Sequence, residues 1–381
     1  MTRPQAYRRD SKRPRVLTRA RARKADHPTL RDIQGGALST LEEASVTDKS
    51  RDIYKGHARM FWAWATWHMV DFSTAPELDL VLVMFMHQLF LDGYNVATGR
   101  TATSAIRYFL PLILPGKTPL PRTQRALDGW RKLCPPQMRL PIPLVAAAAI
   151  AGVLMGTGRP DMAAFVMIAF DTYLRPDECM RLRRRNIVPP VVGGNAPHHQ
   201  WGLIVNDAEA GVPGKTGAQD ESVMVDTTEI SWVLAAMKST GGPDDPLWVF
   251  TVAELRDSFR DALEKLGLGG LHYSLHSLRH GGASHDLLTK RRDLIHTRER
   301  GRWLCDASLR RYGKQTRLQD QINKMPLLTR LFGEQVWSQF TKLLITVGEG
   351  KPFPLALPAV EPVKQKRAQK APTITRRWKI T

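Results

Sequence analysis

Two histidines and an arginine in residues 276–284, HSLRHGGAS, have types and spacing that suit chemistry. His276 and His280 are four positions apart, which places both on one face of a helix, as in paired metal ligands. A metalloprotease helix needs a glutamate directly after the first histidine, and Ser277 stands there instead. No other histidine supplies an evident third ligand. The sequence therefore leaves open a packed helical turn or a site that also uses Arg279.

Further candidates lie before and after this stretch. Arg175 in TYLRPDECMRL precedes Glu178 by three positions, and the proline between them also suits an ordinary helix start. Lys215 lies in PGKTG, between two β-like segments, where a lysine is usually solvated. The segment GRWLCDASLRRYGK holds Trp303 and, nine positions later, Tyr312. Each of these residues alone has an ordinary structural explanation.

Taken together, the order Arg, Lys, His-x-x-Arg, Trp and Tyr resembles the tyrosine recombinase (phage-integrase) family. LRPDECMRL is similar to the family's first-arginine motif, and HSLRHGGAS is similar to its His-x-x-Arg motif. GRW followed by the tyrosine is similar to the final His/Trp and nucleophile segment. The family also carries a lysine in a β-hairpin between the first two motifs. The motifs cover about residues 140–320, and the preceding helical region fits the family's core-binding domain by position and character only.

The resemblance implies a reaction on DNA. Arg175 and Arg279 would neutralise a phosphodiester, for which the arginine fork is well suited. Tyr312 would attack phosphorus and form a 3′-phosphotyrosyl intermediate, while Lys215 would protonate the leaving 5′-oxygen. Neither a metal nor another cofactor is required. The implied catalytic residues are Arg175, Lys215, His276, Arg279, Trp303 and Tyr312, with Glu178 and His280 in support.

The remaining members of this set have narrower implied roles. His276 would donate to a phosphate oxygen or help take the tyrosine proton, and Trp303 would donate its indole N–H and pack the pocket. Glu178 would orient a partner in the site without reacting itself. His280 is expected to make a structural hydrogen bond. The small residues 281–283 are interpreted as room for close packing near a phosphate.

Composition and charge fit a partner that is a polyanion. The chain has 381 residues and a formal net charge of +20. Residues 1–28 hold ten Lys and Arg against two Asp, and residues 349–381 hold eight against two Glu. Such tails attract nucleic acid without reading its sequence, although a solubilising tail or a nuclear address, KRPR, explains them too. Three scattered cysteines without CxxC spacing indicate a reducing compartment.

The pattern of elements predicts a mainly α protein with a small β-sheet (α+β). Helices are expected from about 45 to 135, then at 144–156, 161–173, 176–184, 251–266, 277–289, in the low 300s and at 325–346, with strands at 201–207 and 221–227. The predicted domains are a disordered basic tail (1–35), a helical core-binding, DNA-clamping domain (36–138), an integrase-type catalytic domain (139–347) and a basic, Pro-rich tail (348–381).

Two segments leave alternatives open. The basic segment KRRDLIHTRERGRW, which leads to Trp303, either tracks a DNA backbone or is a solvated loop. The apolar helix expected at 325–346 either packs on its own domain or docks into a neighbouring protomer. In the second case a chain that ends at about residue 324 would fail to form dimers and tetramers on DNA.

For the whole protein we expect a site-specific recombinase or integrase of a mobile element. It would bind double-stranded DNA and assemble on it as a homodimer or tetramer. The alternatives are a type IB topoisomerase-like enzyme and an inactive DNA-binding derivative of a mobile element. With no apolar run near 20 residues and no apolar signal segment, we expect neither membrane insertion nor secretion. The expected location is the nucleus in a eukaryote, otherwise the cytoplasm with the nucleoid.

Overall fold

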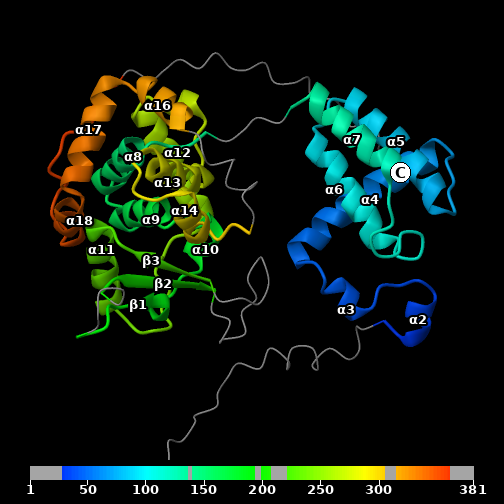
Figure 1. Cartoon of the computed structure of the whole chain (residues 1–381), viewed down its shortest axis with the longest axis horizontal. Coiled ribbons are helices and arrows are strands. Elements are labelled where there is room, and N and C mark those ends of the chain that lie inside the picture. The colour runs from blue at the N-terminus through cyan, green and yellow to red at the C-terminus, as the bar shows by residue number, and fades with distance from the viewer. Residues whose placement is uncertain (1–27, 136–139, 194–198, 207–220, 305–314, 361–381) are drawn as a thin grey trace, which may run out of the picture. The chain divides into compact units, whose positions relative to one another are not determined.

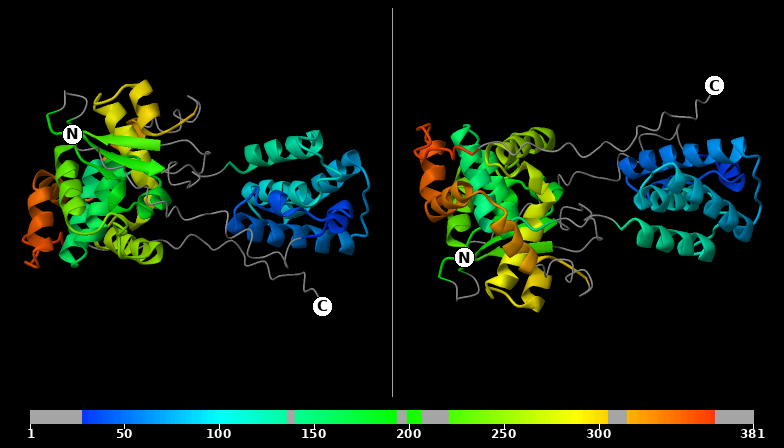
Figure 2. Two further views of the ribbon diagram at one scale, coloured as in Figure 1. Left: turned by 90° about the horizontal axis from the view of Figure 1, so that it is seen from below. Right: turned by 90° about the horizontal axis from the view of Figure 1, so that it is seen from above.

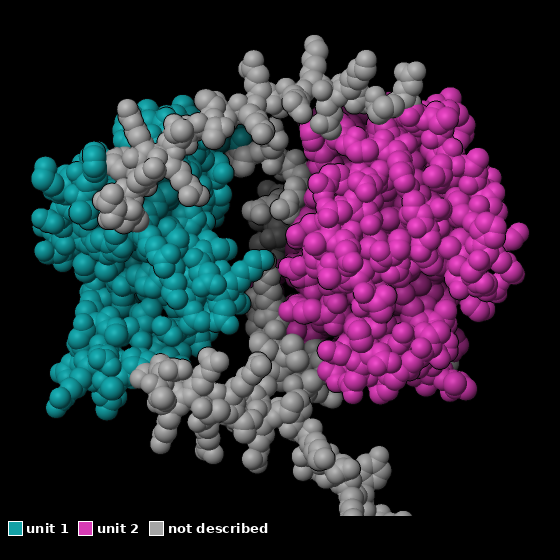
Figure 3. Space-filling model, turned by 180° about the vertical axis from the view of Figure 1, so that it is seen from behind, with its two compact units in different colours: residues 1–138, 367–381 teal, residues 139–366 magenta. Residues whose placement is uncertain are grey.

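The computed structural model describes two compact units, which are coloured separately in Figure 3. The described ranges are 28–135, 140–193, 199–206, 221–304 and 315–360. The first unit lies within 28–135 and the second within 140–360. No helix in these ranges combines the length and apolarity that a membrane span needs.

Unit 1 is helical in its described residues (Figure 1). Its core combines aliphatic side chains with aromatic rings; for example, the rings of Phe61 and Phe85 meet edge to face with centroids 5.3 Å apart. A Cβ on Gly99 would lie 2.7 Å from Met86 Sδ, so only glycine lets the helices approach this closely. The helices are α2 (Leu30–Gln34), α3 (Thr40–Glu43), α4 (Asp48–Trp67), α5 (Ala75–Leu91), α6 (Val96–Phe109) and α7 (Pro121–Leu133).

Helix α2 corrects the expectation that residues 1–35 are a disordered tail throughout. Thr29 and Asp32 form a reciprocal capping box, in which each side chain accepts from the other residue's backbone N–H. Such a box satisfies N–H groups that a helix start otherwise leaves without partners. Residues 1–27 lie outside the described ranges.

Unit 2 is built around two buried helices, α8 (Leu144–Gly156) and α9 (Pro160–Asp171). The sequence of α8 is apolar on all sides, and that of α9 is apolar except at Asp161 and Asp171, which is typical of helices covered by other elements. A Cβ on Gly333 would lie 2.0 Å from the carbonyl oxygen of Val145, so α17 approaches the backbone of α8 directly. The other helices are α10 (Pro176–Met180), α11 (Thr228–Ser239), α12 (Val252–Lys265), α13 (Leu275–Leu288), α14 (Leu294–Arg300), α16 (Gln315–Asn323), α17 (Leu327–Ser338) and α18 (Phe340–Gly348), with short 3-10 helices η2 (Arg184–Asn186) and η4 (Gly269–Leu271).

The sheet of unit 2 has three antiparallel strands in the order β1 (Ile187–Val188), β2 (Trp201–Asn206) and β3 (Glu221–Val225). Leu203 pairs with Ile187 on one side and Val223 on the other, and all three side chains are buried. The predicted fold class, mainly α with a small sheet, is confirmed, as are the two predicted strands. Strand β1 and helix α11 were not predicted.

The C-terminal region corrects a second expectation. The single helix expected at 325–346 is two helices, α17 and α18, with a break at Gln339, and Figure 2 shows both in orange to red along one side of unit 2. The break lets α17 bury Phe332 and α18 bury Phe340 in the same core. Phe353 also packs against this core, so the described part of the predicted tail is not a free tail. Docking into another protomer stays a prediction.

Candidate active site

Arg175 stands at the start of α10, where Glu178 holds it. The backbone N–H of Arg175 donates to Glu178 Oε2 at 2.9 Å, and its guanidinium Nη1 donates to Oε1. The Arg175 side chain is 23% exposed, whereas that of Glu178 is 6% exposed. Burial alone would raise the pKa of Glu178, but the charge of Arg302 and the Arg175 N–H outweigh it and lower the pKa. Glu178 is therefore an ionised, buried anchor for an arginine that reaches the surface.

Arg302 binds the same glutamate from the protein side. Its Nη2 lies 2.7 Å from Glu178 Oε2, and its Nε lies 3.3 Å from Glu221 Oε2, an ion pair without hydrogen-bond alignment. Glu221 is the first residue of β3, and Arg302 follows α14. One guanidinium thus joins the sheet, the loop after α14 and the start of α10.

Arg279 projects from α13 into the interior and is only 3% exposed. Its guanidinium donates to the carbonyl oxygens of Tyr173 and Gly301 and lies 4.9 Å from the centroid of the Trp303 ring. Trp303 in turn stacks on Tyr173, with centroids 6.3 Å apart and an interplanar angle of 17°. Because Tyr173 is two residues before Arg175, these contacts bring the first-arginine, His-x-x-Arg and GRW motifs into one site.

The other expected residues differ in what the structure says of them. His276 and His280 lie on α13 with half-buried side chains, on the helix that carries Arg279. Lys215 and Tyr312 lie outside the described residues. The catalytic and supporting roles of all eight residues remain predictions. Among the described residues, no group of three or more His, Cys, Asp or Glu side chains is arranged to hold a metal ion.

The two glycines after the His-x-x-Arg motif serve contacts within the protein. A Cβ on Gly281 would lie 2.1 Å from the carbonyl oxygen of Ile142, and one on Gly282 would lie 2.0 Å from that of Phe170. These distances are far below van der Waals contact. The predicted close packing is confirmed for these glycines, which let α13 approach α9 and the chain before α8, whereas a nearby phosphate stays a prediction.

The basic segment between α13 and Trp303 contains helix α14, and three of its arginines form ion pairs with aspartates. Arg291, Arg292 and Arg300 pair with aspartates from α9, from the residue after β3 and from α13. The pairs are Arg291–Asp226 at 2.8 Å, Arg292–Asp226 at 2.5 Å, Arg300–Asp171 at 2.9 Å and the closer pair Arg292–Asp286. A wholly solvated loop is wrong for this segment, because it includes helix α14 and these paired arginines, whereas its contact with a DNA backbone stays a prediction.

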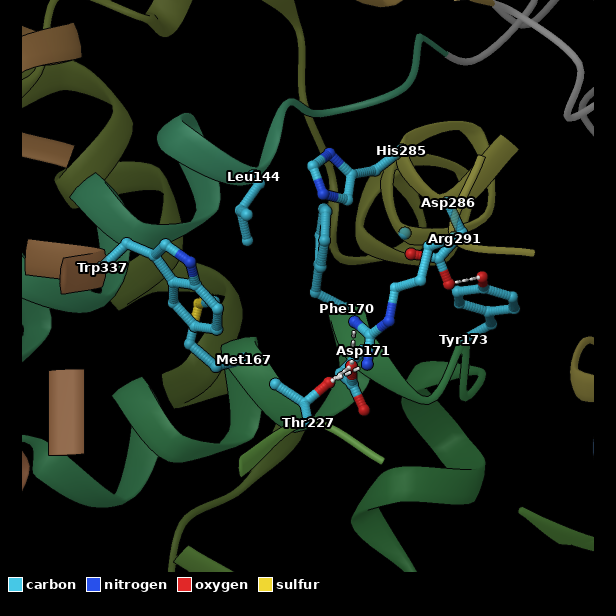
Figure 4. Close-up of a pocket in the computed structure, with 11 residues that line it drawn as sticks. Leu144, Met167, Phe170, Asp171, Tyr173, Thr227, His285, Asp286, Arg291 and Trp337 are labelled. Atoms are coloured by element: carbon cyan, nitrogen blue, oxygen red, sulfur yellow. Dashed lines mark hydrogen bonds and ion pairs between the residues drawn. The ribbon is translucent and has the colours of Figure 1, made fainter. Parts of the chain in front are cut away.

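A small cavity borders this network, as Figure 4 shows. On one side Asp286 accepts from the Tyr173 hydroxyl, and Asp171 accepts from Thr227. Burial and the charge of Asp286 raise the pKa of Tyr173, so this hydroxyl stays a donor and is no candidate nucleophile near neutral pH. The cavity volume of about 20 Å³ suits a single water. It is a structural cavity and is too small for a substrate.

Sequence reasoning missed the residues that organise the site. Arg302 lies inside the quoted GRW motif, and Asp286 lies on the same helix as Arg279, yet neither has a spacing that marks its role. Arg300 also escaped notice; it donates to the Asp171 carbonyl and lies over the Tyr173 ring, 5.5 Å from its centroid. The only available signal was that buried arginines need carboxylates, which is a rule about partners in space.

Comparisons with known proteins add a likeness among solved structures. No protein-family model matches the chain, and no curated protein matches it. The chain is similar to XerH site-specific recombinase bound to palindromic difH substrate in a post-cleavage complex, with a TM-score of 0.43, 15% identity and coverage of 69% of this chain and 76% of that one. The values for XerH bound to difH before cleavage are 0.41, 15%, 65% and 70%.

A third similar structure is that of XerA recombinase, with a TM-score of 0.33, 15% identity and coverage of 77% of this chain and 95% of that one. All three solved structures are of recombinases.

Proposed function

We propose that the protein is a site-specific DNA recombinase that cuts and rejoins DNA through a 3′-phosphotyrosyl bond to Tyr312. The observation that carries this proposal is the convergence of the motifs. Arg279 donates to the carbonyl of Tyr173, 106 positions away, and to that of Gly301, which supports a shared site for the two arginines and Trp303. A phosphodiester resists nucleophiles because it is an anion, and a pair of arginines can neutralise its charge.

In this reaction the tyrosine oxygen forms a bond to phosphorus as the bond from phosphorus to the 5′-oxygen breaks. Lys215 gives a proton to the leaving oxygen, and His276 helps to take the proton of the tyrosine. The free 5′-hydroxyl of a partner strand later attacks the tyrosyl phosphate and releases Tyr312. The covalent link conserves the bond, so neither nucleotide hydrolysis nor a metal is needed. Arg175 contacts the phosphate from the protein surface, and Arg279 interacts with it from its buried position behind the site.

Unit 1 supports DNA as the substrate through the outer face of α6. Gly99 faces the neighbouring helices, whereas Arg100 and Ser104 are exposed and Arg107 is half-exposed. The sequence of α6 contains no acidic residue. A helix face with arginine and hydroxyl side chains suits contact with phosphates, which are bound by just these groups. We infer that unit 1 and unit 2 both bind duplex DNA and that the protein assembles on it as a dimer or tetramer.

The biological setting follows from the same proposal. An enzyme that carries its own strand-transfer chemistry suits a mobile element. It acts where DNA is, in the nucleus of a eukaryote or at the nucleoid of a bacterium. Recovering the repeats that flank the gene in its genome would supply the DNA site for the experiments below.

The decisive experiment is covalent trapping on a nicked suicide substrate that carries those flanking repeats. Cleavage beside the nick releases a short fragment, so the tyrosyl link cannot be reversed. The wild-type chain should form an adduct that resists denaturation, and Tyr312→Phe should form none while still binding the DNA. Absence of an adduct on DNA with the true site would contradict the proposal. Relaxation of supercoiled plasmids that lack the site would favour a type IB topoisomerase instead.

A further inference from the structure

Arg302 has an unusual backbone. Its φ of 52° lies in the left-handed region, which residues other than glycine rarely adopt. The preceding residue is equally constrained, because a Cβ on Gly301 would lie 2.3 Å from the Trp303 ring. The turn that delivers Trp303 to the site therefore passes through a strained residue with a large side chain. A glycine at position 302 would make the same turn without strain, so the arginine side chain calls for a reason.

The reason lies in what the guanidinium contacts. The Arg302 side chain is 7% exposed and lies between two carboxylates, Glu178 at 2.7 Å and Glu221 at 3.3 Å. Arginine can meet two carboxylates at once with a rigid planar fork, whereas a lysine ammonium is a single point charge. Buried as it is, Arg302 does not reach a substrate.

Glu178 transmits this contact to the surface. Its Oε2 accepts from both Arg302 Nη2 at 2.7 Å and the backbone N–H of Arg175 at 2.9 Å, while its Oε1 accepts from the Arg175 guanidinium. With Arg302 in place the carboxylate has one orientation that serves all these donors. Without it, a buried glutamate would keep only Arg175, and that arginine would lose its fixed direction.

We propose that Arg302 is a positioning residue for strand cleavage, which acts through Glu178 to aim Arg175 at the scissile phosphate. The inference rests on the proposed recombinase function. It assigns to the middle residue of GRW a task apart from that of Trp303. It also connects the start of β3, where Glu221 contacts Arg302, to Arg175 of the arginine pair.

Two substitutions test the inference. Arg302→Gly removes the guanidinium and relieves the backbone, and Arg302→Lys keeps the charge and the backbone but loses the fork. Lys290→Gly is the matched control, because Lys290 has the same left-handed backbone, with φ of 56°, and an exposed side chain. The measurements are the first-order rate of adduct formation at saturating suicide substrate, the Kd for DNA, the thermal midpoint and the rate from about pH 5 to pH 8.

We expect Arg302→Gly to slow adduct formation by about 10- to 100-fold, as a small misplacement of a catalytic group does. The Kd for DNA should stay within about twofold. Arg302 does not reach the DNA, and its two carboxylate partners offset any long-range attraction of its charge. Loss of Arg302 should also raise the pKa of Glu178. The mutant rate should therefore fall as the pH drops through a range where the wild-type rate is constant. The rate of adduct formation by Arg302→Lys should lie between the rates of the wild type and Arg302→Gly. The rate of Lys290→Gly should match that of the wild type.

Three results would overturn the inference. The first result is that Arg302→Lys has the rate and pH profile of the wild type. This variant keeps a side chain at position 302, so no change of the backbone is required for it to fold. Another is a slower Arg302→Gly whose pH profile is that of the wild type, since a purely structural ion pair would behave so. The last is absence of an adduct in the wild type itself, which would sink the proposed function together with this inference. The first two results leave the proposed function standing, so the two failures are distinguishable.

Discussion

Two arginine-containing regions of this protein look alike in sequence and differ in structure. Helix α6 of unit 1 carries Arg100 and Arg107, and the segment 290–302 of unit 2 carries a denser set. Within the described residues, neither arginine of α6 forms an ion pair, and Arg100 is exposed. In the second region the side chains of Arg292, Arg300 and Arg302 are only 9%, 7% and 7% exposed and are bound to carboxylates.

The difference lies in the carboxylates that each region meets. Asp171, Asp226 and Asp286 come from α9, the end of β3 and α13, and each faces the basic segment. Their charges cancel most of the field that the arginines would otherwise project to solvent. No carboxylate of the part of the chain that the structure describes pairs with Arg100 or Arg107 of α6, which is why we expect these two charges to be available to a phosphate backbone. Density of arginine is therefore a poor guide to a DNA-binding surface unless the carboxylates around it are known.

The sharpest test of this contrast is removal of one buried arginine. Arg292→Ala leaves Asp286 buried with its Tyr173 hydrogen bond but without its cation. We expect the free energy of unfolding, measured by urea denaturation, to fall by about 3–5 kcal/mol, because an uncompensated buried charge is strongly unfavourable. The control is Arg260→Ala, whose pair with Asp257 is 64% and 68% exposed. Its loss should change stability by less than about 1 kcal/mol.

Equal, small losses from the two substitutions would contradict the distinction between a structural arginine network and an ordinary exposed pair. The distinction would also be contradicted if Arg292→Ala lost DNA binding while its free energy of unfolding stayed at the wild-type value. In that case the segment would track DNA after all.

The opposite test removes the arginines of α6. The double substitution Arg100→Ala and Arg107→Ala should leave the unfolding free energy nearly unchanged and weaken DNA binding to all sequences alike. The plot of log affinity against log salt concentration should lose about 0.9 in slope for each phosphate contact removed. Fluorescence anisotropy on duplex DNA across a salt series measures this slope.

Arg131→Ala on α7 serves as the matched control, since Arg131 lies 3.5 Å from Asp128 Oδ1 and its charge is already offset. The same slope in the double variant and in the wild type would remove α6 from the DNA-binding surface. The charge of the two sequence tails would then account for the affinity.

Much of the fold could be predicted from local pattern. Helix α8 begins and ends where predicted, at 144 and 156, because an apolar run there is bounded by Pro143 and by glycine. Strands β2 and β3 were predicted because two short strand-like runs, WGLIVND and ESVMVDT, flank a Gly-rich segment. Helix α11 was missed since it follows β3 with only two residues between them and lacks a clear boundary signal. The break at Gln339 was missed because it satisfies tertiary burial and no local rule.

The candidate site was only partly predictable. Residue types and order led to the two arginines through a family resemblance, and the contact between Arg279 and Tyr173 then placed their motifs together. No periodicity links Arg302 to Glu178 or Asp226 to Arg291, because these pairs join elements far apart in the chain. The left-handed backbone of Arg302 could not be anticipated either, since arginine rarely adopts it.

The charge of Asp226, a partner of segment 290–302, should have a smaller effect, which appears in how stability depends on pH. Burial alone would raise the pKa of Asp226, but Arg300, Arg292 and Arg291 outweigh it and lower the pKa below its ordinary value. A group whose pKa is lower in the folded state stabilises that state above its unfolded pKa, and this stabilisation is lost as the pH falls through the folded pKa. Asp226→Asn removes the charge. The stability difference between the wild type and this variant should therefore be largest near neutral pH and shrink below about pH 4.

The size of this difference is modest, less than about 1 kcal/mol, because Asp226 is partly exposed and solvent screens its attraction to the arginines. Urea denaturation midpoints from pH 7 to pH 3 measure it. Asp257→Asn in the exposed pair on α12 is the control and should give a smaller, flatter difference. A stability difference for Asp226→Asn that stays constant over this range would mean that Asp226 acts as a hydrogen-bonding group alone, and that the charge balance of segment 290–302 rests on the other two aspartates.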